Sequence, residues 1–136
     1  YTIDEMKKLN LPHAECIAKN LFVRDDKKKH FYLISVQEEK QIDLKKLRET
    51  IDSRRLSFAS EKDLQEIMGL EKGSVTPFGV LNDDNKSVKV FIDERYNNRT
   101  IAIHPNENTM TVWLKTEHVD EMLRDHGSSV TMINLG

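Results

Sequence analysis

The sequence predicts an α+β domain built on a mixed, mostly antiparallel β-sheet. Strand-like apolar runs occur in pairs separated by short polar turns, which is typical of β-hairpins. Helical segments interrupt these runs irregularly and do not alternate with them as in a regular βαβ array. No internal repeat, low-complexity tract or Pro/Gly/Ser-rich linker divides the chain, so we expect residues 1–136 to form a single domain.

Local signals at their ends justify the individual elements. Threonine, serine or aspartate precedes each of the first three expected helices, as N-cap residues do, and proline or glycine ends two of them. In the first half, we expect a helix that begins at the capping box of Thr2 and Glu5 and ends at Pro12, followed by strands 17–24 and 30–36 joined by the turn 25–29. A helix over 44–51 with Asp43 as N-cap and an extended segment over 56–59 come next. The last element of this half is a helix capped by Ser60 and Asp63, which reaches Met68 and ends at Gly69. In the second half, we expect strands 88–92, 100–104 and 109–114, a helix over 117–126 ended by Gly127, and a strand over 130–133.

Composition limits the classes of function. The 136 residues carry a formal net charge of -2, with 38% hydrophobic and 32% charged residues, enough apolar matter for one core. No apolar run has the length of a membrane span or resembles a signal peptide, so a cytoplasmic globular protein is expected. The single cysteine, Cys16, excludes an internal disulfide and a cysteine-based zinc site.

Nucleic-acid binding would depend on local basic patches, since the chain as a whole is not basic. Segments 19–29 and 40–55 each carry three more positive than negative side chains. Either segment could contact a phosphate backbone, although a solvated face is the commoner outcome for such runs. The spacing places Phe31, Tyr32 and Phe58 in the core, with stacking of one of them on a base as the alternative.

Familiar catalytic motifs are missing. There is no Walker loop, GxGxxG, GxSxG or HExxH pattern. The five histidines, at positions 13, 30, 104, 118 and 126, do not form a pair at metal-ligand spacing with a third partner. We therefore expect no metal and no cofactor.

Three segments could carry chemistry, and each has a plain structural alternative. Lys19 and Asn20 interrupt an apolar strand, where a lysine also serves simply to discourage edge-to-edge aggregation. The loop from Gly73 to Gly79 could present backbone N–H groups to an oxyanion, or could be only a turn between a helix and a strand. The strand-end His104 and the asparagines after it could orient a substrate hydroxyl or amine, or could form a type I turn.

Taken together and in order, the strings KNLFVRDDKKKHFYLISV, LSFASEKDLQEIMGLEKGSVTPFGVLND and IAIHPNENTMTVWL closely resemble the freestanding prolyl-tRNA editing proteins of the YbaK/PrdX group. Those proteins are related to the editing domain inserted in bacterial prolyl-tRNA synthetases. Within the group, the chain looks most like the deacylases that remove alanine from tRNA(Pro). The resemblance implies a strongly bent sheet surrounded by helices, metal-free hydrolysis of an aminoacyl ester, the acceptor end of tRNA(Pro) as a partner, and prolyl-tRNA synthetase as a second one.

The resemblance also implies a set of site residues. The catalytic residues would be Lys19, Asn20, Gly73, Ser74, Val75, Thr76 and His104, and the substrate pocket would include Leu21, Pro77, Phe78, Asn106 and Asn108. Family members carry a further N-terminal segment ahead of the position that matches Tyr1, so we expect weaker tRNA binding and unchanged pocket chemistry. Two alternatives stay open: a deacylase for another small residue, cysteine or serine, and a catalytically inactive module of the same fold that binds tRNA or the synthetase.

Overall fold

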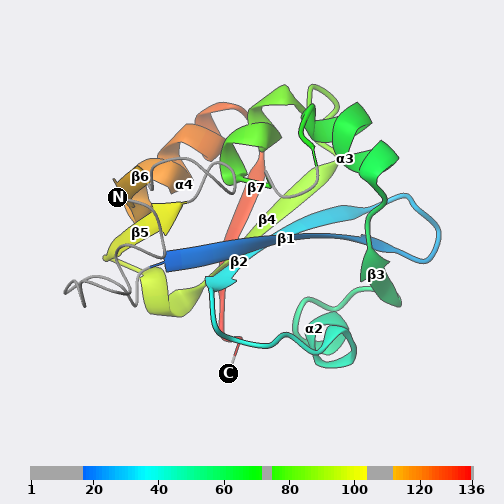
Figure 1. Ribbon diagram of the computed structural model, residues 1–136, viewed down its shortest axis with the longest axis horizontal. Coiled ribbons are helices and arrows are strands. Elements are labelled where there is room, and N and C mark those ends of the chain that lie inside the picture. Colours follow the sequence, from blue (N-terminus) through cyan, green and yellow to red (C-terminus); the bar gives the residue numbers. More distant parts are fainter. Residues whose placement is uncertain (1–16, 72–74, 104–111, 136) are drawn as a thin grey trace.

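The computed structural model describes residues 17–71, 75–103 and 112–135 (Figure 1). The helix expected before Pro12 lies outside these residues. The described elements follow the predicted order, with two short 3-10 helices that the sequence patterns did not indicate. They are β1 (Ile17–Asp25), β2 (Phe31–Gln37), α2 (Leu44–Thr50), β3 (Leu56–Phe58), α3 (Glu61–Met68), η2 (Pro77–Asn82), β4 (Val88–Asp93), η3 (Glu94–Tyr96), β5 (Thr100–Ile103), β6 (Val112–Lys115), α4 (Thr116–Asp125) and β7 (Ser129–Ile133).

A seven-stranded sheet forms the centre of the fold. Its strand order is β6-β5-β1-β2-β4-β7, and β3 pairs with β1 beside this path. The pairs β1–β2, β1–β3 and β5–β6 are antiparallel, whereas β1–β5, β2–β4 and β4–β7 are parallel. The mixed α/β class is confirmed, but pairings among the described strands divide equally and are not mostly antiparallel. The parallel pairs join strands that are distant in sequence, so hairpin spacing carries no information about them.

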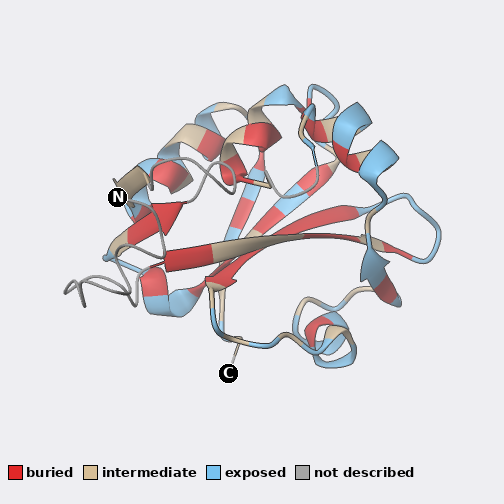
Figure 2. Cartoon of the chain, in the orientation of Figure 1, coloured by how far each residue is buried: buried red, intermediate tan, exposed pale blue. Residues whose placement is uncertain are grey.

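Helices cover the two faces of the sheet unequally. In Figure 1, α3 and α4 lie above the sheet, while α2 lies below it beside β3. The larger core fills the upper side and includes Phe22, Leu33 and Val90 of the sheet with Leu64 of α3 and Leu123 of α4. A smaller core lies on the α2 side, and its buried members are Val23, Tyr32, Ile34, Leu47 and Leu56. Figure 2 shows this burial along the central strands.

The predicted caps are present. The Asp43 side chain accepts a hydrogen bond from the backbone N–H of Lys45, and Ser60 and Asp63 form a reciprocal capping box at the start of α3. Gly69 ends α3 at φ 65°, a left-handed conformation that favours glycine. Within the described ranges, no helix is both long and apolar enough to span a membrane.

Candidate functional site

Strand β1 carries the first predicted site residues and divides them between its two faces. Side chains alternate along a strand, so Lys19 shares a face with Leu21 and Val23 on the α2 side. Asn20 projects to the other face, between Ala18 and Phe22 of the larger core. Both Lys19 and Asn20 are half-buried. Although they are neighbours in sequence, Lys19 and Asn20 therefore project from opposite faces of the sheet.

The edge of β1 that faces away from β2 is shared by two other strands. Strand β5 pairs with Ile17 and Ala18 at the beginning of β1, and β3 pairs with the three residues at its end. Among the described residues, no strand pairs with this edge at Asn20. The C=O of Phe22 points to this edge, where it accepts a hydrogen bond from the N–H of Ala59, so alternation directs the backbone groups of Asn20 the same way. Asn20 therefore lies between the described end of β5 and the beginning of the β3 pairing along this edge.

A buried hydroxyl group fixes the carboxamide of Asn20. Ser35 is its partner across the β1–β2 ladder, and the Ser35 Oγ donates a hydrogen bond of 2.5 Å to the Asn20 Oδ1. Ser35 is 0% exposed in a strand that is otherwise apolar apart from its last residue. With Oδ1 occupied, the Asn20 Nδ2 group remains as a donor for a ligand carbonyl. Ser35 was not predicted as a site residue from the sequence, although a single serine in the apolar run FYLISV is the signal that could have pointed to it.

A hollow of about 450 Å³ opens where Asn20 lies. Three of the predicted site residues, Asn20, Leu21 and Val75, line it. The other lining residues come from β1, the end of β3 and the start of α3, namely Phe22, Phe58, Ala59, Ser60, Glu61 and Leu64. This volume falls in the usual range for small-molecule sites. The structure thus brings Asn20 and Leu21 of the first predicted segment together with Val75 of the second, whereas Lys19 does not line this hollow.

The rest of the predicted glycine loop is occupied with packing. Thr76 and Pro77 are buried, and Pro77 begins η2 at a position where proline is favoured. Phe78 is half-buried against the larger core. A Cβ atom at Gly79 would collide with the side chains of Leu70 and Met68, so this glycine allows η2 to approach α3 closely. Of the described loop residues, only Val75 lines the hollow.

Several predicted site residues lie outside the described residues: Gly73, Ser74, His104, Asn106 and Asn108. The residue before His104, Ile103, is described and pairs with Ala18 in parallel orientation. The described part of β5 therefore ends level with Ala18, one residue before Lys19. In the described ranges, no three His, Cys, Asp or Glu side chains are grouped to hold a metal ion.

Phe58 differs from its predicted place in the core. Phe31 and Tyr32 are buried as expected, but Phe58 is 60% exposed and is the one exposed large hydrophobic residue of the described chain. Strand β3 is short and lies at an edge of the sheet, so Phe58 has no covering layer beyond the hollow that it lines. Spacing alone could not distinguish this edge position from a core position.

Two aspartates at the end of β1 hold the hairpin turn and the start of β3. Burial raises the pKa of Asp25, but hydrogen bonds from the backbone N–H groups of Lys29 and His30 outweigh it, so this pKa lies below its ordinary value. Asp26 binds Arg54 through two hydrogen bonds of 2.7 and 3.2 Å, and this contact lowers the pKa of Asp26. The pair links the turn to the segment that leads into β3 and so to Phe58.

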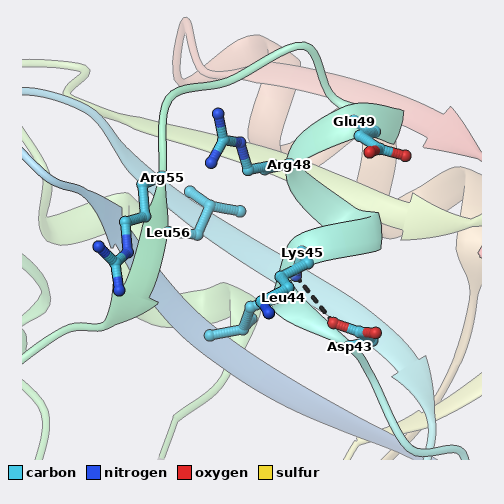
Figure 3. Close-up of a pocket in the computed structure, with 7 residues that line it drawn as sticks. All are labelled: Asp43, Leu44, Lys45, Arg48, Glu49, Arg55 and Leu56. Carbon is cyan, nitrogen blue, oxygen red and sulfur yellow. Dashed lines mark hydrogen bonds between the residues drawn. The ribbon is translucent and has the colours of Figure 1, made fainter.

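A second and larger hollow, of about 680 Å³, lies between α2 and β3 (Figure 3). It contains none of the predicted site residues, but Arg48, Arg55 and Lys45 line it together with Asp43 and Glu49. Figure 3 shows Arg48 and Arg55 flanking Leu56, with Glu49 on the other side of the helix.

Acidic side chains pair with only some of the basic side chains in segment 40–55. Arg54 is paired with Asp26, and Lys40 lies 3.6 Å from a carboxylate oxygen of Asp93. Among the described residues, no carboxylate forms an ion pair with Arg48 or Arg55. These two guanidinium groups are available to an external anion.

Comparison with known proteins identifies the family. The sequence model of the aminoacyl-tRNA editing domain matches residues 1–122. Prolyl-tRNA editing protein ProX of Acetoanaerobium sticklandii is 43% identical over 136 residues, covering 99% of this chain and 83% of the relative. Prolyl-tRNA synthetase associated domain-containing protein 1 of Bos taurus is 29% identical over 143 residues, covering 98% and 81%.

A solved structure supports the fold. The crystal structure of a candidate trans-editing enzyme for prolyl-tRNA synthetase superposes with a TM-score of 0.64 at 21% identity, covering 98% of this chain and 78% of that one. The mixed sheet, the hollow on β1 and the match of the family model to residues 1–122 all fit an editing domain. The chain belongs to the aminoacyl-tRNA editing domain family and is an aminoacyl-tRNA deacylase.

Proposed function

We propose that this protein hydrolyses mischarged tRNA(Pro) in trans, with alanyl-tRNA(Pro) as its substrate and without a metal ion. The 43% identity to a prolyl-tRNA editing protein over nearly the whole chain carries the choice of tRNA. The choice of alanine rests on the resemblance of the three motifs to the deacylases that remove alanine from tRNA(Pro), and the hollow at Asn20 would hold the amino acid with the terminal ribose.

The proposed reaction relies on positioning. An aminoacyl ester is already reactive, so the enzyme needs to place a water molecule and stabilise the negative charge that forms on the carbonyl oxygen. The Asn20 Nδ2 group is a suitable donor for that oxygen because Ser35 holds the opposite end of the carboxamide. Backbone N–H groups of Gly73 to Thr76 would supply further donors.

The remaining groups would bind the tRNA end. Lys19, which projects from the other face of β1 and does not line the hollow, would hold a phosphate of the tRNA end by charge, and His104 would orient the terminal ribose or the amino group. The vicinal ribose hydroxyl would help to activate the water. No covalent nucleophile takes part, and Cys16 belongs to none of the three motifs.

Selection against proline would be steric. One methylene of difference in a binding pocket provides only about 1–3 kcal/mol, so affinity for alanine alone would discriminate weakly. A rigid wall that the proline ring cannot enter discriminates more strongly. Leu21 and Val75, which line the hollow, are the proposed wall.

A panel of charged tRNAs tests the proposal. Purified protein is incubated with alanyl-, cysteinyl-, seryl- and prolyl-tRNA(Pro), and release of the amino acid is followed over time. We expect rapid release of alanine and no release of proline. The Asn20→Ala variant is the matched control, and should lose about 100-fold in rate, the usual effect of removing one oxyanion donor.

The other outcomes separate the alternatives. Faster release of cysteine or serine than of alanine would assign a different small substrate. Tight binding of tRNA without release of any amino acid would identify a binding module and overturn the proposed activity.

A further inference from the structure

We propose that Phe58 is a stacking platform for the terminal adenine of the tRNA. This inference rests on the proposed function and adds a base-binding subsite to the same hollow. Phe58 is 60% exposed, whereas the other large hydrophobic residues of the described chain are at least half-buried. An exposed aromatic ring that lines a hollow offers a ligand a flat apolar face.

The position of Phe58 suits the base. It lines the same hollow as Asn20, from the other strand of the β1–β3 pair. As the register partner of Val23, Phe58 belongs to the α2 side of the sheet, whereas the Asn20 side chain belongs to the α3 side, so the two residues border the hollow from opposite faces. In aminoacyl-tRNA the ester and the adenine are attached to the same ribose. An ester carbonyl at Asn20 therefore places the adenine only the width of one ribose away. Of the two aromatic residues that line the hollow, Phe22 is buried and Phe58 is exposed, so Phe58 is the one that can receive the base.

Stacking also fits the recognition that is needed. Every tRNA ends in the same base, so the site has no sequence to read at this position. An aromatic ring binds any base by its π-face, without contacts to the base edges. Two polar groups beside Phe58 are already used, because the N–H of Ala59 donates to the C=O of Phe22 and the Ser60 Oγ caps α3.

The experiment is a binding cycle that does not depend on turnover. RNA minihelices with a CCA end carry either the normal terminal adenine or an abasic residue, and affinities are measured for the wild type and for Phe58→Ala. We expect Phe58→Ala to bind the normal RNA about tenfold more weakly, a loss of about 1.4 kcal/mol. The wild type should lose a similar factor on the abasic RNA, and the variant should lose little more.

Two further variants separate an aromatic effect from an apolar one. Phe58→Trp should keep the affinity, whereas Phe58→Leu, which retains apolar area without a π-face, should resemble Phe58→Ala. With 2-aminopurine as the terminal base, quenching of its fluorescence on binding should be seen with the wild type and lost with Phe58→Ala. Because the side chain is exposed, melting temperatures of the three variants should remain close to that of the wild type.

The failure of this inference is distinguishable from failure of the proposed function. The stacking site would be overturned if the wild type and Phe58→Ala bound the normal RNA with equal affinity. It would also be overturned if the loss of affinity from the variant and the loss from the abasic residue were additive. Neither result would affect the proposed deacylation. Absence of turnover with every charged tRNA would overturn the proposed function, and the binding cycle would still decide whether Phe58 holds the base.

Discussion

Replacing Ser35 by alanine tests whether a buried hydroxyl group positions the carboxamide of Asn20. The Ser35 Oγ donates to the Asn20 Oδ1 at 2.5 Å, and Ser35 is completely buried. Without this hydroxyl group the carboxamide can turn, and its Nδ2 group is then directed at the substrate for only part of the time. We expect Ser35→Ala to lower kcat with little change in KM, because the lost contact acts in the transition state.

The magnitude follows from two separate costs. Losing one neutral hydrogen bond costs about 1 kcal/mol of folding stability. A single oxyanion donor contributes about 100-fold in rate, and disorder of that donor forfeits only part of it, so we expect a decrease in kcat of about 3- to 10-fold. Both effects are measurable. A loss of about 1 kcal/mol in the free energy of unfolding leaves a domain of ordinary stability folded, so the decrease in kcat should exceed any decrease caused by a smaller folded fraction.

A double-mutant cycle with Asn20 provides the assay. Initial rates of alanine release are measured for the wild type, Ser35→Ala, Asn20→Ala and the double variant, with Ser35→Thr as the conservative control. If Ser35 acts through Asn20, its replacement should have almost no effect once Asn20 is absent, and Ser35→Thr should restore most of the rate. An equal loss from Ser35→Ala in both backgrounds would refute the positioning role, as would a full rate in Ser35→Ala.

Three further predictions concern the charged residues. Lys19→Ala should lower the turnover of alanyl-tRNA(Pro) at least tenfold, about 1.4 kcal/mol of barrier, and full activity would remove Lys19 from the site. Replacing Arg48 and Arg55 together by glutamine should weaken RNA binding and reduce the slope of log affinity against log salt by about one to two, measured in a salt titration; an unchanged slope would exclude contact with phosphates. The lowered pKa of Asp25 means that its charged form stabilises the folded state above the unfolded value of 3.8, and that this contribution disappears as the pH falls through the folded value. Asp25→Asn should therefore reduce stability at pH 7 and narrow the difference from the wild type at pH 3, as denaturant titrations at both pH values would show.

Local features of the fold could be predicted from the sequence because their causes are local. The hairpin of β1 and β2 follows from two apolar runs around a polar turn, and the caps at Asp43 and Ser60 follow from side chains that bond to nearby backbone groups. The left-handed end of α3 at Gly69 is of the same kind. Each of these depends on residues within a few positions of one another, which a sequence displays directly.

Features that depend on distant pairing could not be predicted in this way. The parallel pairing of β1 with β5 joins Ala18 to Ile103, and no local pattern specifies it. The same holds for the position of Asn20 between the described pairings of β5 and β3, because two separate strands share one edge of β1. Of the predicted site, the structure brings Asn20, Leu21 and Val75 into one hollow, whereas the catalytic roles of these residues stay predictions.

Ser35 and Phe58 are both linked to this hollow, Ser35 through its hydrogen bond to Asn20 and Phe58 as a lining residue. Ser35 places a hydroxyl group inside an apolar strand, and a buried polar group is tolerated only with a partner, which here is Asn20. Phe58 leaves an aromatic ring uncovered. The Ser35 hydroxyl group stabilises the fold through this hydrogen bond and also holds the Asn20 carboxamide in place, while the exposed Phe58 side chain remains accessible to a further contact. A ligand with a carbonyl group for Asn20 and a flat base for Phe58 accounts for both, and the terminal aminoacyl-adenosine of tRNA has these two groups on a single ribose.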